Sequence, residues 1–236
     1  MDILEVHDNA SFQIEAKDWW IRARFHELEK NIQLDQVTVL VDIGCGSGVN
    51  LFLTWERHPT IRLLGVDPNS TDVSYNWLPT DIAISAKFPG EAHQADVVLL
   101  MDVLEHVEDD FEFLRDIVNR VRPGIRFFLS VPAFSQLWSQ RDLELGHYRR
   151  YTKKKIIRLC TDTGLTVDYC RYRFSFLAVV LFFVKKRIKS TGLVSTGGYQ
   201  SSLFASCLRL LSWVEGGIPW IPFGTSIILV ASKNAK

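Results

Sequence analysis

The stretch Val39-Leu40-Val41-Asp42-Ile43-Gly44-Cys45-Gly46-Ser47-Gly48 decides how this chain of 236 residues folds. An apolar, β-branched run leads directly into three glycines within five residues, which is typical of a buried strand followed by a tight turn. Residues 49–57 then have the pattern of a helix that His58-Pro59 ends. Free backbone N–H groups at the start of such a helix favour an anionic ligand group.

The chain continues this alternation of strands and helices. Alternation at this spacing argues for a parallel sheet covered on both faces, with ligands bound beyond the carboxyl ends of the strands. Strands are predicted at residues 61–66, 95–101, 125–131, 165–173 and 225–231, and helices at 109–121 and from the N-cap Thr152 to Gly164.

The composition is that of a globular protein. Hydrophobic residues make up 47% and charged residues 23%, which argues against disorder. Lys+Arg and Asp+Glu both number 27, so the basic excess of a dedicated nucleic-acid binder is absent and we expect no nucleic-acid partner. Residues 1–100 hold 15 acids and 7 Lys/Arg, whereas residues 101–236 hold 12 and 20. This asymmetry fits an anionic partner for the second half, or pairing of the two halves.

Two features predict a reducing, cytoplasmic setting. The four cysteines form no CxxC pair, and the acidic N-terminus lacks a signal-peptide pattern. The longest nearly apolar run, residues 174–184, is shorter than the roughly 20 residues that span a bilayer.

Four ordered segments resemble the motifs of class I S-adenosylmethionine-dependent methyltransferases. They read VDIGCGSG at 41–48, GVDP at 65–68, ADVVLLMDVLEHV at 95–107 and VRPG at 121–124. The resemblance implies a seven-stranded, mostly parallel Rossmann-like sheet with helices on both faces, an antiparallel last strand, and S-adenosylmethionine as cofactor. A dinucleotide fingerprint needs Gly or Ala where Val49 stands, so a nicotinamide-dependent oxidoreductase is the weaker alternative.

The resemblance also implies the cofactor-binding residues. The glycines would approach the methionine end of the cofactor, Asp42 its amino group, and Asp67 its ribose; an alternative for Asp67 is to cap the next helix. Asp81 would read the adenine amine. The full implied set is Asp42, Gly44, Cys45, Gly46, Gly48, Asp67, Pro68, Asp81, Asp102 and Val103.

The segment after the predicted strand at 95–101 carries Glu105 and His106. An imidazole suits a base for a substrate hydroxyl because its pKa lies near neutrality, so His106 and His147 are the candidate catalytic residues. A similar segment binds a divalent metal in some ubiquinone-type O-methyltransferases. We expect no metal, and Asp102, Glu105 and His106 are its ligands if one is required. A third interpretation is that Glu105 and His106 only orient the loop.

Further motifs place the candidate substrate side. Residues 19–24 (WWIRAR), 131–133 (VPA), 137–139 (LWS) and 146–151 (GHYRRY) resemble a subgroup of the family with the signatures HWWFRAR and VPA…LWS…GH.RRYT. That subgroup is generally assigned to small-molecule or cell-surface glycan and lipid metabolism. Arg side chains suit phosphate or carboxylate groups. The candidate substrate residues are Trp20, Arg24, Trp138, His147, Tyr148, Arg149 and Arg150.

About fifty residues precede the last strand, where the family's fold has a short hairpin. Residues 174–184 are apolar, 185–189 are basic, and 201–214 predict a helix with a wide apolar face; residues 174–222 hold five Lys/Arg and one acid. Two interpretations stay open: a cap or homodimer interface, and peripheral contact of residues 174–214 with the inner face of a membrane. We divide the chain into an N-terminal segment (1–36), the methyltransferase core (37–173), this insertion (174–223) and the last strand (224–236).

We therefore expect methyl transfer from S-adenosylmethionine to a small-molecule or lipid- or glycan-linked acceptor, through oxygen, nitrogen or carbon. A non-catalytic scaffold of the same fold is the alternative, because fold alone does not fix function.

Overall fold

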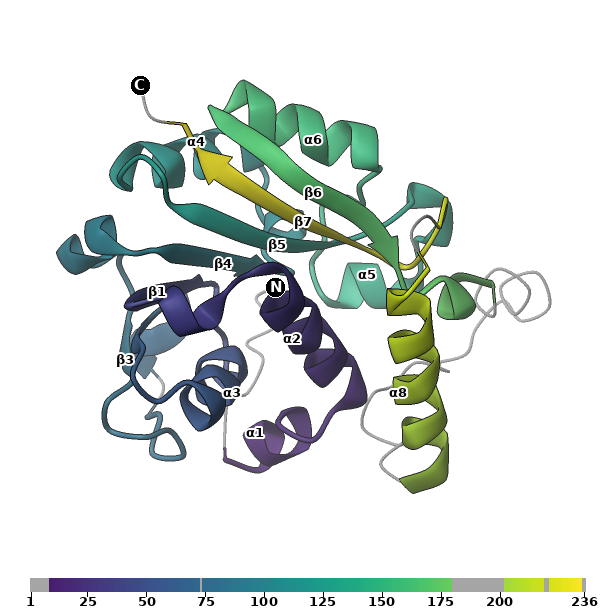
Figure 1. Ribbon diagram of the computed structural model, residues 1–236, viewed down its shortest axis with the longest axis horizontal. Coiled ribbons are helices and arrows are strands. Elements are labelled where there is room, and N and C mark those ends of the chain that lie inside the picture. Colours follow the sequence, from purple (N-terminus) through teal and green to yellow (C-terminus); the bar gives the residue numbers. More distant parts are fainter. Residues whose placement is uncertain (1–8, 73, 180–201, 219–220, 235–236) are drawn as a thin grey trace.

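A single seven-stranded sheet forms the centre of the computed structural model, which describes residues 9–72, 74–179, 202–218 and 221–234 (Figure 1). The strand order is β3-β2-β1-β4-β5-β7-β6. The strands are β1 (Val39–Ile43), β2 (Arg62–Val66), β3 (Ala83–Ser85), β4 (Val97–Met101), β5 (Arg126–Pro132), β6 (Leu165–Arg173) and β7 (Ser226–Lys233).

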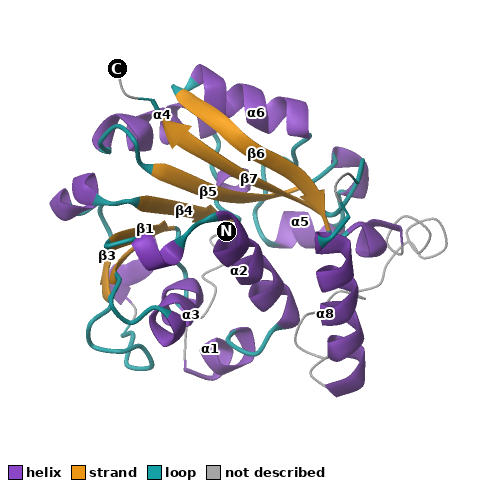
Figure 2. Ribbon diagram, in the orientation of Figure 1, coloured by secondary structure: helices purple, strands orange, loops and turns teal. Residues whose placement is uncertain are grey.

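In this sheet of described strands, β7 runs in the direction opposite to all the other strands. It pairs antiparallel with β5 and with β6, while β1, β2, β3, β4 and β5 pair parallel (Figure 2). The predicted mostly parallel sheet with an antiparallel last strand is therefore confirmed.

Helices cover both faces of the sheet. The helices α1, α2, α3 and α8 lie on one side in Figure 1, and α4 and α6 lie on the other. They span Asn9–Glu15 (α1), Trp19–Asn31 (α2), Val49–Arg57 (α3), Asp110–Arg120 (α4), Gln140–Glu144 (α5), Lys153–Asp162 (α6) and Ser202–Gly216 (α8). None of the helices in the described part of the chain combines the length and apolar character needed to cross a membrane.

Alternation along the strands divides the buried side chains into two cores. Leu40 packs with α2 and α3 residues such as Phe25 and Leu51, whereas the next residue, Val41, belongs to the core that α4 and α6 complete. This alternation follows from the period of two in a strand. A sheet covered on both faces buries every position of β4, so its sequence is continuously apolar.

The connection between β2 and β3 differs from the usual strand–helix–strand unit. Only 14 positions separate Asp67 from Asp81. In the described part of that connection the chain forms a 3-10 turn over Pro68–Asp72 and a short β3 that begins at Ala83. Asp81 is exposed and precedes β3, so it lies at the amino end of that strand. The structure therefore does not place Asp81 at the carboxyl edge, where the adenine role requires it.

Gly224 allows β7 to begin close to the end of β6. A Cβ on Gly224 would lie 2.2 Å from the carbonyl oxygen of Arg173, and backbone cannot move aside as a flexible side chain can. We predict that Gly224→Ala destabilises the protein by about 1–3 kcal/mol, the usual cost of overpacking. Thermal unfolding measures this as a fall in Tm of about 2–4 °C for each kcal/mol. Gly90→Ala is the control, because a Cβ there meets nothing within 4 Å; an equal loss in both variants would contradict the packing argument.

Candidate active site

The glycine turn after β1 closes onto the end of β2. Gly44, Gly46 and Gly48 all have positive φ angles, between 52° and 81°, which residues with a Cβ rarely adopt. The Gly44 N–H donates to the Val66 carbonyl at 2.7 Å, and the Gly46 N–H donates to Asp67 Oδ2 at 2.9 Å. The turn therefore holds Asp67 at the carboxyl edge of the sheet, beside the start of α3.

Asp67 has a second local tie. Its Oδ1 accepts a hydrogen bond from the Asn69 N–H at 2.9 Å, so the carboxylate also caps the 3-10 turn that starts at Pro68. The capping alternative is thus present in the structure. Each carboxylate oxygen has a further lone pair, so capping is compatible with binding ribose hydroxyls.

Asp42 is a buried carboxyl group at the end of β1 and is only 1% exposed. Within the described residues, neither of its oxygens has a hydrogen-bond partner of normal geometry, although the Asn50 side chain is close enough to lower its pKa. Burial raises the pKa of Asp42 to about 7. A buried acceptor without a partner costs free energy, so a cationic ligand group arriving there would be favoured.

Asp102 is fixed by an ion pair with α2. It follows β4 with a φ of 57°, a left-handed conformation. Arg24 forms a salt bridge with its Oδ2, and Ser130 Oγ donates to its Oδ1 at 2.6 Å. Burial lowers the pKa of Arg24 to about 10, so Arg24 remains a cation at neutral pH. Arg24 was expected to contact substrate, but its charge is already used to hold Asp102.

His147 is brought against the end of β4 by the loop that contains it. The Tyr148 N–H donates to the Glu105 carbonyl at 2.7 Å. The rings of His147 and His106 meet edge to face with centroids 4.6 Å apart. The two candidate catalytic histidines, forty-one positions apart in the sequence, therefore lie in contact.

Asp142 orients His147. Its Oδ1 lies 2.9 Å from His147 Nδ1, and Arg150 donates to both of its oxygens, at 2.7 and 3.0 Å. Burial alone would raise the pKa of Asp142, but the hydrogen bonds from His147 and Arg150 hold it well below its usual range. The buried Asp142 carboxylate thus contacts His147 through Nδ1 and does not contact Nε2.

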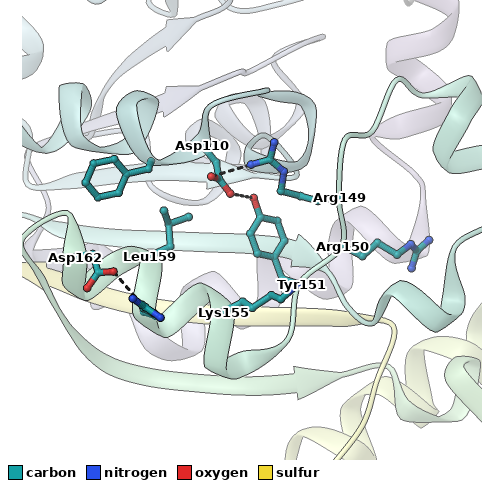
Figure 3. A pocket seen from close by; sticks show the side chains of 9 residues that line it. Asp110, Arg149, Arg150, Tyr151, Lys155, Leu159 and Asp162 are labelled. Atoms are coloured by element: carbon teal, nitrogen blue, oxygen red, sulfur yellow. Dashed lines mark hydrogen bonds and ion pairs between the residues drawn. The ribbon is translucent and has the colours of Figure 1, made fainter.

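Arg149 and Arg150 anchor this loop and are not available as free cations. Arg150 is bound to Asp142, and Arg149 forms an ion pair with Asp110 at 2.8 Å. Figure 3 shows Asp110 between Arg149 and the hydroxyl group of Tyr151, which donates to Asp110 at 2.6 Å. The expectation that these two arginines grip an anionic substrate does not fit these contacts.

The other predicted residues lie around this edge with different exposure. Tyr148 is exposed, whereas Trp138 and Trp20 are half-buried. Trp20 stacks on Phe174 with ring centroids 4.3 Å apart, so this ring is occupied by an internal contact. Val103 packs against the glycine turn: a Cβ on Gly44 would lie 2.7 Å from Val103 Cγ2.

The predicted metal ligands are rearranged. Glu105, His106 and His147 offer ligand atoms that all lie within 4.8 Å of one another. Asp102 is paired with Arg24 and is not part of this group. His147 therefore takes the place of Asp102 in the set of possible metal ligands. Burial raises the pKa of Glu105 to about 8, and partial burial, followed by the charge of His147, lowers the pKa of His106.

Sequence reasoning missed three supporting groups. Asp142 matches the Asp between LWS and GH in the subgroup signature but is not among the candidate site residues, Ser130 lies inside a strand, and Trp77 lies in an irregular loop. Trp77 Nε1 donates to the Ser47 carbonyl at 3.0 Å, and Ser47 Oγ donates to Glu15 of α1. The sequence signal for Asp142 is its position between the LWS and GHYRRY segments. The structure adds that its side chain is buried.

Comparison with known proteins gives the family. The model of the methyltransferase domain matches residues 18–169, about two thirds of the chain, so the chain belongs to the methyltransferase-domain family. A ubiquinone biosynthesis O-methyltransferase of Coxiella burnetii is 27% identical over 151 residues, which are 54% of this chain and 62% of that protein. The chain thus aligns with less than two thirds of the length of this curated relative.

Solved structures agree on the fold. A phosphoethanolamine N-methyltransferase of Haemonchus contortus in complex with S-adenosyl-L-methionine superposes with a TM-score of 0.58 at 15% identity, covering 91% of this chain and 53% of that chain. The [4+2]-cyclase SpnF superposes equally well, with a TM-score of 0.58 at 15% identity, covering 92% of this chain and 82% of that one. The class is therefore the S-adenosylmethionine-dependent methyltransferase fold, and the cyclase shows that this fold also occurs in a protein of another name.

The residues present fit S-adenosylmethionine, the cofactor of this family. Asp42 is a buried carboxyl group without a partner among the described residues, which suits the ammonium group of the methionine part. The positive-φ glycines bring bare backbone to the same edge, and Asp67 offers oxygens for the ribose hydroxyls. The cofactor would be held by the glycine turn together with Asp42 and Asp67.

We predict that Asp42→Asn weakens S-adenosylmethionine binding at least tenfold and stabilises the empty protein at pH 8. The affinity falls because a charge-assisted hydrogen bond is lost. The stability rises because the folded-state pKa of about 7 exceeds the ordinary 3.8. Folded wild-type protein binds more protons than unfolded protein in this window, so its stability falls as pH rises from about 4 to about 7.

Calorimetric titration and thermal unfolding between pH 4 and pH 8 measure both effects. The Tm advantage of Asp42→Asn should shrink toward pH 4. Asp168→Asn, an exposed acid on β6, is the control for a charge change alone. Unchanged cofactor affinity in Asp42→Asn would remove Asp42 from the site.

Proposed function

We propose that this protein transfers the methyl group of S-adenosylmethionine to a hydroxyl oxygen of a small-molecule or lipid- or glycan-linked acceptor. The observation that carries the choice of oxygen is the pair formed by His147 and the buried Asp142, at the carboxyl edge beside Glu105 and His106. A hydroxyl acceptor must lose a proton, so a positioned imidazole is useful there. The similarity to a ubiquinone biosynthesis O-methyltransferase supports the same choice.

The chain's own residues would act by binding, orienting and accepting a proton. S-adenosylmethionine supplies an electrophilic methyl group on a sulfonium when bound. His147 Nε2 would accept the hydroxyl proton of the acceptor as the acceptor oxygen takes the methyl group. His147 Nδ1 donates to Asp142, whose carboxylate favours the resulting imidazolium. Arg24 holds Asp102 in place at the carboxyl end of β4.

We predict that His147→Ala lowers kcat/KM by about 10²–10⁴-fold, the usual contribution of a general base. S-adenosylmethionine affinity, measured by calorimetry, should stay unchanged, and added imidazole should restore part of the rate. The assay follows the labelled methyl group into catechol, a prenylated phenol and a lipid-linked sugar. Leu143→Ser is the control, since Leu143 is on α5 and 58% exposed. Transfer to amines but to no hydroxyl would overturn the choice of oxygen.

Asp142 is a positioning residue in this mechanism, and its test is the pH profile. Asp142→Asn removes the negative charge that stabilises protonated His147. We therefore predict a lower kcat and an acid limb of the rate profile that moves to lower pH. An unchanged profile at reduced stability would mean that Asp142 only supports the loop.

A metal-assisted reaction is the second candidate, favoured by the cluster of Glu105, His106 and His147. There the ion would polarise the acceptor oxygen, and His147 would be a ligand instead of a base. Dialysis against a chelator separates the two. We predict an unchanged rate for the proton-accepting His147, whereas a loss restored by Mg²⁺ or Zn²⁺ would favour the metal.

A further inference from the structure

Helix α8 directs described polar residues toward the protein and described apolar residues toward solvent, the reverse of an ordinary amphipathic helix. Its described buried positions are Leu208, Ser212 and Glu215, spaced four and three residues apart on one face. The side chains of Leu210, Leu211, Trp213 and Val214 point to solvent instead. An apolar helix face normally packs into a core, whereas these described apolar side chains of α8 lie outside it.

Buried charges hold α8 in this orientation. Arg173, at the end of β6, lies 2.8 Å from Glu27 of α2 and 3.5 Å from Glu215 of α8. Arg173 also donates to the Ser212 carbonyl at 2.9 Å. Rotating the helix to bury its apolar face would separate the buried Arg173 from Glu215 and from the Ser212 carbonyl, which is unfavourable for a charge that is out of water. The outward direction of the apolar side chains is therefore fixed by contacts on the inner side.

The exposed apolar side chains of the helix form one strip, here called the outer face of α8: Leu210, Leu211, Trp213 and Val214. Positions 210, 213 and 214, and 211 and 214, are three or four residues apart and so adjoin on a helix. Trp213 is 68% exposed and Leu210 is 60% exposed. Apolar residues scattered singly are ordinary on a protein surface, whereas these four adjoin one another on one helix. Figure 1 shows α8 standing beside α2, at the side of the molecule.

The charge around the outer face suits an anionic surface. Between residues 174 and 232 the sequence has one acid, Glu215, and it is buried against Arg173. Lys30 and Arg171 donate to the carbonyls of Gly216 and Ile218, so two cations lie at the C-terminal end of the strip. An exposed tryptophan is also typical of the boundary between headgroups and acyl chains.

The strip is small for a dimer interface. Fifteen residues of helix are about 22 Å long and about 10 Å wide. The projected face is therefore roughly 200 Å², whereas a stable interface buries about 800 Å² on each partner. A bilayer surface needs no such area, because it accepts apolar side chains one by one.

We propose that the outer face of α8 docks this protein on the surface of an anionic phospholipid bilayer. Leu210, Leu211, Trp213 and Val214 enter the boundary between headgroups and acyl chains, and Lys30 and Arg171 face the phosphates. Because α8 packs on α2, which supplies Arg24 to the site, docking brings the carboxyl edge of the sheet into fixed relation with the bilayer.

Vesicle co-sedimentation of the full chain tests this. The vesicles are phosphatidylcholine alone and phosphatidylcholine mixed with an equal amount of phosphatidylglycerol. Wild-type protein should sediment with the mixed vesicles, and Leu210→Ser combined with Trp213→Ser should lower the partition coefficient at least tenfold. Leu143→Ser, an equally exposed leucine elsewhere, should bind as wild type does. Unchanged Tm in the double variant shows that the inner contacts persist, and calorimetric binding of S-adenosylmethionine reports the site independently.

Three results would overturn the proposal. Wild-type protein could fail to sediment with the anionic vesicles. The double variant could sediment as well as wild type, which would place the contact on another part of the chain. Alternatively, light scattering could show a wild-type dimer that the double variant dissociates while vesicle binding stays the same, which would make a second copy the occupant of the face.

Discussion

The ion pair between the buried Arg24 and the half-buried Asp102 joins the parts of this protein that the site requires. Asp102 follows β4 in a left-handed conformation, and Arg24 reaches it from α2. Ser130 on the neighbouring strand β5 donates to the same carboxylate. One contact therefore ties a helix and two strands at the carboxyl edge of the sheet. The floor of the site is held by side chains that are 78 positions apart in the sequence.

The same constraint recurs around the molecule, because a charge taken out of water needs a partner. Asp142 is held by Arg150 and His147, and Arg173 lies between Glu27 and Glu215. Asp42 stands out against these pairs, since the described residues give it no hydrogen-bond partner. A carboxyl group without a hydrogen-bond partner, at the position where the resemblance to the family implies the ammonium group of the cofactor, is consistent with a site that a ligand completes.

Pairing of charges also gives internal partners to the arginines that the sequence places on the candidate substrate side. Arg24, Arg149 and Arg150 have the residue type that recognises phosphate, but each is bound to a carboxylate of this chain. Residue type in a motif indicates what a side chain can do, while its partner is set by the fold. The surface of α8 follows the same rule: its buried side contains the charges that find partners, and its apolar side chains are left outside.

The sequence alone determined six of the seven described strands, the helices at 49–57, 109–121 and 152–164, the glycine turn, and the place of Asp42 and Asp67 at strand ends. These features depend on neighbours within a few positions, through apolar periodicity, positive φ angles and helix caps. The tertiary structure alone decided that His147 meets His106 and Asp142, that Asp102 belongs to Arg24, and that Asp81 lies at the wrong end of β3. Those outcomes join residues distant along the chain or depend on where a short strand starts, and no local pattern encodes either.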